Sequence, residues 1–138
     1  MPLADAFVSN DAAVKLITED VQPSLHLGGI DVKSLDAGKL AQLWAMMTER
    51  EFLEALGEFP SVHDVSDEGP WIFGCPAAFQ SRLAALSEAD QKSWAERWAP
   101  EFPSNIGGTQ VLTMLRDLCT LSKLAESKRE KLYIWNCL

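Results

Sequence analysis

The feature that most restricts the fold is a broad apolar stripe in the last third of the chain. After Gly107-Gly108-Thr109, apolar side chains recur at helical spacing: Val111, Leu112, Leu115, Leu118, Cys119 and Leu121 or Leu124. A stripe this wide is typical of a central helix that other elements contact on several sides. The pattern therefore predicts a long helix in the middle of a helical domain.

Capping residues predict two helices near the middle of the chain. Asp36 is a suitable N-cap for a helix whose apolar face holds Leu40, Leu43, Trp44 and Met47. Thr48-Glu49-Arg50-Glu51 has the spacing of a capping box, with Met47 and Phe52 as its hydrophobic staple. This box predicts a second, short helix with Phe52, Leu53 and Leu56 on its apolar face and Gly57 as its stop.

Three further helices are expected from similar signals. One begins near Pro76, and another opens at Ser87, carries Trp94 and Trp98 one turn apart, and ends at Pro100. We expect this tryptophan pair to pack in the core, with a ligand pocket as the alternative. A weaker pattern predicts a helix over residues 10–19, capped by Asn10.

These elements predict one mainly α domain over residues 1–138, a compact bundle of about five to six short helices. Residues 71–73 and 132–135 are short, apolar and rich in strand-favouring side chains. Pairing of these two segments into a small two-stranded β element is therefore an alternative that the sequence does not decide. Because residues 132–138 are so apolar, we expect them to dock against the core or to complete a partner's surface.

One set of residues also carries a resemblance. The order is Trp71, Pro76, a leucine-containing stretch at 83–86, Trp98-Ala99, the leucine-rich helix and the segment 132–135. Over its C-terminal half the chain resembles a group of small, uncharacterised bacterial proteins. The resemblance implies a bacterial source and brings no function with it.

The charge of the chain is unevenly distributed. The net charge is −8, and residues 49 to 101 hold eleven acidic and four basic side chains. This acidic stretch repels phosphate backbones, so we do not expect nucleic-acid binding. It suits a basic protein partner, with simple solubility as the alternative interpretation.

The remaining composition favours a cytoplasmic protein that makes no membrane contact. Residues 1–5 provide neither a basic segment nor an apolar stretch of secretory length, and no apolar run approaches a membrane span of about 20 residues. Cys75, Cys119 and Cys137 form no Cys-x-x-Cys pair. We expect them to be reduced, structural thiols.

The richest polar cluster is the segment 58–75. Its chemistry-bearing side chains are Glu58, His63, Asp64, Asp67, Glu68 and Cys75. A histidine with carboxylates can bind a divalent metal or act in acid–base chemistry, and a cysteine beside a histidine can act as a nucleophile. The sequence holds no His-x-x-x-His, Gly-x-Ser-x-Gly or phosphate-loop motif to support either role, and a solvated acidic loop explains the segment equally well. We assign no catalytic, metal-binding or cofactor-binding residue.

Two functions remain from these observations. The preferred hypothesis is a non-enzymatic protein-interaction module, for example an acidic antitoxin or immunity-type protein that covers a basic partner. Its predicted partner-binding residues are Glu58, His63, Asp64, Asp67 and Glu68. The alternative is a small-molecule or metal-dependent enzyme that uses the 58–75 loop, which requires these side chains to converge on one pocket. The oligomeric state is left open.

Overall fold

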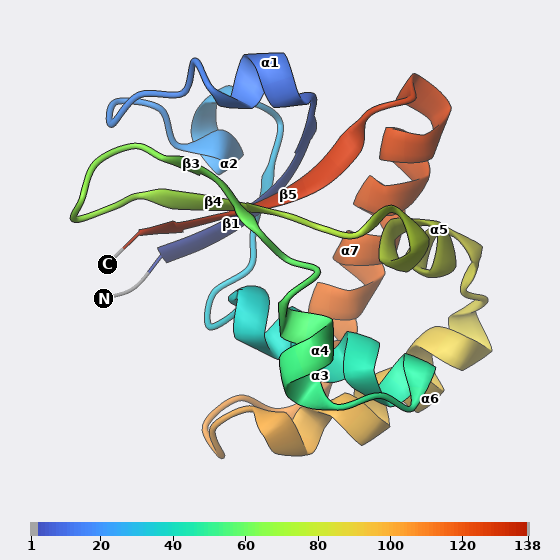
Figure 1. Cartoon of the computed structure of the whole chain (residues 1–138). Coiled ribbons are helices and arrows are strands. Elements are labelled where there is room, and N and C mark those ends of the chain that lie inside the picture. Colours follow the sequence, from blue (N-terminus) through green and yellow to red (C-terminus); the bar gives the residue numbers. More distant parts are fainter. Residues whose placement is uncertain (1–2, 138) are drawn as a thin grey trace.

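The computed structural model describes residues 3–137 and contains a five-stranded antiparallel sheet (Figure 1). In the order β2-β1-β5-β4-β3, its strands are β1 (Leu3–Ser9), β2 (Ile30–Asp31), β3 (Ser61–Asp64), β4 (Trp71–Gly74) and β5 (Lys131–Cys137). β1 pairs with β5 along its whole length, from Leu3 opposite Cys137 to Ser9 opposite Lys131. The two ends of the described chain therefore lie side by side in the middle of the sheet.

This sheet shows that the expected mainly α bundle is wrong. Residues 71–74 and 131–137 do pair, with Ile72 opposite Trp135, but they are two strands of a five-stranded sheet. Sequence reasoning missed β1, β2 and β3; the longest of them, β1, contains two alanines and an aspartate, residue types that are depleted in strands. Its conformation depends on pairing with β5, which lies at the opposite end of the chain.

The helices were predicted more accurately than the strands. Within residues 3–137 they are α1 (Asp11–Val14), α2 (Pro23–His26), α3 (Ala37–Thr48), α4 (Phe52–Leu56), α5 (Ala77–Ala85), α6 (Glu88–Trp98), the 3-10 turn η1 (Ala99–Glu101) and α7 (Gly108–Lys128). Two predicted N-caps are confirmed, because the side chains of Asp36 and Ser87 accept hydrogen bonds from backbone N–H groups three residues later, at 2.8 and 3.1 Å. Most of the apolar stripe of α7 is buried as expected, with Leu121 rather than Leu124 completing it, and Leu112 is only half-buried.

The core lies mainly between the sheet and the long helices. Ala4 and Ala6 of β1 and Leu132 and Ile134 of β5 face a cluster built from α3, α5, α6 and α7. Small alanines in β1 let the helical layer approach the sheet closely. The docking of residues 132–137 is thus confirmed, while Leu138 lies outside the described residues.

A thinner layer covers the opposite face of the sheet. Here Phe7 stacks on Tyr133, with ring centroids 5.6 Å apart, and Val14 and Ile17 pack nearby. The helix predicted over residues 10–19 is wrong in length, because only α1 forms, although Asn10 caps it by accepting from the N–H of Ala13 at 2.9 Å. After this turn the chain continues without helical structure, and Ile17 is buried against the side chains of the sheet.

The corner between α3 and α4 differs from the predicted capping box. Thr48 is the last residue of α3, and its hydroxyl donates to the carbonyl of Trp44 at 2.7 Å. Glu49 then adopts a left-handed conformation with φ 53°, and the N-cap of α4 is Glu51, whose side chain makes no capping bond. The corner is instead held by an ion pair between Arg50 and Glu58.

The two tryptophans of α6 have different environments. Trp98 is fully buried, and its indole N–H donates to the carbonyl of Lys39 at 2.9 Å, as expected of a core residue. Trp94 is only half-buried, and the guanidinium of Arg97 lies 4.2 Å from its ring centroid.

Among the helices of residues 3–137, none combines the length and the apolar character needed to cross a membrane.

Candidate functional site

The five predicted partner-binding residues do not form one cluster. Glu58 lies beyond the end of α4, where its carboxylate accepts bonds from the indole N–H of Trp44 at 3.2 Å and from the guanidinium of Arg50. These bonds fix Glu58 to the α3–α4 corner. Its role in the structure is therefore explained by packing of that corner.

His63 and Asp64 belong to the edge strand β3. The ring Nε2 of His63 lies 2.9 Å from the carbonyl oxygen of Ile17, which fits an Nε2–H donor that ties β3 to the segment after α1. The carboxylate of Asp64 accepts a hydrogen bond from the hydroxyl of Ser61. Both side chains thus have local structural partners.

Asp67 and Glu68 occupy the loop that joins β3 to β4, and both are exposed. Figure 1 shows this hairpin loop extending outward from the sheet, away from the helices. Across residues 3–137, no group of three or more histidine, cysteine or acidic side chains could hold a metal ion. The convergence that the enzyme hypothesis requires of the 58–75 loop is not found.

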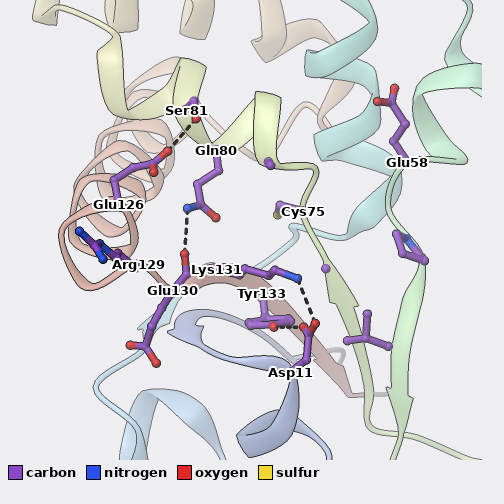
Figure 2. A pocket seen from close by; sticks show the side chains of 14 residues that line it. Asp11, Glu58, Cys75, Gln80, Ser81, Glu126, Arg129, Glu130, Lys131 and Tyr133 are labelled. Carbon is purple, nitrogen blue, oxygen red and sulfur yellow. Dashed lines mark hydrogen bonds and ion pairs between the residues drawn. The ribbon is translucent and has the colours of Figure 1, made fainter.

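A cavity of about 460 Å³ lies elsewhere, where β4 and β5 meet α5 and the end of α7 (Figure 2). Its wall is made by Asp11, Glu58, Pro60, Val62, Gly74, Cys75, Ala77, Gln80, Ser81, Glu126, Arg129, Glu130, Lys131 and Tyr133. Only Glu58 and Cys75 of the predicted cluster reach this cavity. The chain segments that form it are widely separated in the sequence.

The floor of this cavity carries a hydrogen-bonded chain. The phenol of Tyr133 donates to one carboxylate oxygen of Asp11, and the ammonium of Lys131 contacts the other at 3.0 Å. Figure 2 shows these three side chains directed toward one another. The bond from Tyr133, followed by that from Lys131, lowers the pKa of Asp11 below its usual value. The charge of Asp11 is therefore satisfied within the protein.

The opposite wall is fixed by α5. Gln80 is almost completely buried, and its amide donates to the carbonyl of Glu130 at 3.1 Å while its oxygen accepts from the N–H of Leu132 at 2.8 Å. Beside it, the hydroxyl of Ser81 donates to Glu126 at 2.7 Å. These bonds join α5 to the end of α7 and the start of β5, so hydrogen bonds hold this wall of the cavity in place.

Two side chains of the cavity wall, Cys75 and Tyr133, are weaker acids than usual. Burial raises the pKa of the Cys75 thiol to about 12, and burial together with the bond to Asp11 raises the pKa of Tyr133 well above its usual value. Both groups are therefore neutral at physiological pH, and a thiol must be ionised to act as a nucleophile. Chemically, the cavity is suited to binding polar groups and contains no activated thiolate or phenolate.

Sequence reasoning missed this cavity because its key contact joins residues far apart. Asp11 and Tyr133 are separated by 122 positions and meet only because β1 pairs with β5. The continuous apolar run of β5 favoured a strand, but it did not indicate β1 as a partner. Comparison of the chain with protein-family models, curated proteins and solved structures gives no match.

Proposed function

We propose that this protein is a non-enzymatic protein-interaction module that binds a basic partner. The observation that carries the proposal is the β3–β4 hairpin, which presents Asp64, Asp67 and Glu68 at the surface. Within residues 3–137, none of these three carboxylates forms an ion pair with a lysine or arginine. Their charge is therefore available to an external partner.

The protonation of the side chains that line the cavity supports a binding function over a catalytic one. Cys75 and Tyr133 are kept protonated, and the carboxylate of Asp11 is already engaged by two donors. One concrete form of the proposal is an antitoxin or immunity-type protein that covers the basic site of a toxin. An exposed acidic hairpin would accelerate such an encounter through electrostatic steering.

The proposal is tested by affinity capture from a bacterial lysate with the wild-type protein and the double variant Asp67→Asn/Glu68→Gln. We expect a basic protein to be retained at low and physiological salt, and its retention to fall in the variant and at high salt. Both substitutions are at exposed positions, so the variant should fold normally. Capture of no partner at either salt concentration, or equal capture by the variant, would contradict the proposal.

A further inference from the structure

The short helix α4 presents two large apolar side chains, Phe52 and Leu53, at the surface, while Leu56 packs against the core. Phe52 is 38% exposed and Leu53 77% exposed, and among the five residues of α4 only Ala55 is buried. Sequence reasoning gave this helix an apolar face, as for a helix packed on the core, but the structure leaves much of that face in water. Exposing two adjacent large apolar side chains is unfavourable unless another surface covers them.

The surroundings of this face are strongly acidic. Glu49, Glu51 and Glu54 are exposed, and within the described residues they form no ion pair. The nearest base in the sequence, Arg50, is engaged by Glu58. The two exposed apolar side chains of α4 are therefore accompanied by three nearby glutamates whose charge no ion pair within the described residues neutralises.

Other exposed leucines do not have this combination. Leu16, 79% exposed, is a single apolar side chain beside Lys15, and Leu25 and Leu27, 73% and 43% exposed, have no acidic residue within three positions. Single exposed apolar residues are normal on protein surfaces. A second copy of this chain is also a poor occupant for α4, because the glutamates beside the two helices would repel each other.

We propose that α4 is a docking surface for a partner segment that carries an apolar side chain flanked by lysine or arginine. The apolar side chain would cover Phe52 and Leu53, while the flanking bases would meet the glutamates. This inference rests on the proposed interaction function and adds to it an apolar anchor on a separate element from the hairpin. Apolar anchors buried at the centre of an interface usually dominate its affinity, and the charged rim sets its specificity.

The test uses a synthetic helical peptide of leucine and lysine as the probe, titrated into the isotope-labelled protein and followed by amide NMR. We expect saturable shifts at residues 51–57. Two control peptides separate the contributions: replacing lysine by glutamate should abolish binding, and replacing leucine by serine should weaken it about tenfold or more. If the serine peptide binds as tightly as the leucine peptide, the apolar part of the proposal is wrong.

Matched variants locate the site on the protein. Leu53→Ser should weaken binding of the leucine–lysine peptide about tenfold, whereas Leu16→Ser, at an equally exposed position, should leave it unchanged. Shifts confined to residues 64–68, and unchanged binding by Leu53→Ser, would overturn the docking site on α4 while leaving the hairpin interaction standing. Sedimentation that shows a wild-type dimer lost in Leu53→Ser would identify a second copy as the occupant and also overturn the proposal.

Discussion

The side chain of Gln80 bonds to the backbone N–H of Leu132, in the place where the carbonyl of a neighbouring strand would otherwise accept. Its oxygen accepts from the N–H of Leu132 at 2.8 Å, at the point where β5 begins, while the carbonyl of Leu132 accepts from the N–H of Cys75 at 3.2 Å. Leu132 is fully buried, so each of these backbone groups needs a protein partner. A helix side chain thus completes the hydrogen bonding of the central strand.

This relationship predicts the effect of Gln80→Ala. The substitution leaves the buried N–H of Leu132 without a partner, which should lower the free energy of unfolding by about 1–3 kcal/mol. Denaturant melts monitored by tryptophan fluorescence would measure the loss. Ser81→Ala removes an exposed hydrogen bond next to it and serves as the control, with an expected change below about 0.5 kcal/mol. Equal stability of wild type and Gln80→Ala would show that the bridge contributes nothing.

The chain of Tyr133, Asp11 and Lys131 predicts a change in acid stability. Because the pKa of Asp11 is lowered in the folded protein, its contribution to stability is present at neutral pH and is lost as the pH falls below about 4. Tyr133→Phe removes the largest cause of this shift, so the pKa of Asp11 should rise toward its usual value. Carboxyl-carbon NMR titration would measure it.

The control for this experiment is Lys131→Met, which removes the second cause. Lys131 lowers the pKa of Asp11 through its hydrogen bond and through its positive charge, so this variant should also raise that pKa. The acid-dependent loss of stability should also be smaller in Tyr133→Phe than in the wild type. An unchanged titration of Asp11 in Tyr133→Phe would show that the phenol does not bond to the carboxylate in solution.

The cysteines should differ in reactivity. Burial raises the pKa of Cys75 to about 12 and that of Cys119 to about 11, so both thiols should resist a disulfide-exchange reagent in the native protein. Half-buried Cys137 should react before them, and all three should react after unfolding in concentrated guanidinium chloride. Mass spectrometry of peptides from a labelling time course would identify the order. Rapid native labelling of Cys119 would place it on the surface and break the observed register of α7.

Removing residues 132–138 should abolish folding, because it deletes most of the strand between β1 and β4. Leu132, Tyr133 and Ile134 are fully buried, and Trp135 is 4% exposed. We expect the truncated chain to show no cooperative unfolding transition by circular dichroism. The milder variant Trp135→Ala should still fold but lose about 3–5 kcal/mol, and exposed Lys131→Ala is its control. A truncated chain that melts like the full one would contradict this central role.

The helices were predictable from sequence because their signals are local. The N-caps Asp36 and Ser87 act within three residues of themselves, and the stripe on α7 depends only on spacing along one helix. The sheet depends on contacts between distant segments. Asp5, for example, is fully buried in β1, where one carboxylate oxygen accepts from the N–H of Ser24 at 2.8 Å, a contact that no local pattern indicates. An aspartate at that position argues against a strand when only the sequence is considered.

The candidate site was predictable to the same limited degree. The exposed acids Asp67 and Glu68 were identified from composition, since a turn of charged residues between apolar segments is a local signal. The cavity around Asp11 and Tyr133 was not, because it exists only after β1 and β5 pair. The exposure of Leu53 was missed for a different reason. Helical spacing identifies an apolar face but does not say whether another element covers it.

The position of β5 has a consequence for how the chain folds during synthesis. Along the chain, β1 precedes and β5 follows every helix of residues 3–137, yet β5 must insert between β1 and β4. Until then the nascent chain has two unpaired strand edges and an apolar helical layer without its sheet, the kind of surface that chaperones recognise. Contacts between strands so far apart also raise the contact order, which predicts slow folding, on a scale of roughly milliseconds to seconds. Production of this protein should therefore be limited by aggregation of unfinished chains and should improve at reduced temperature.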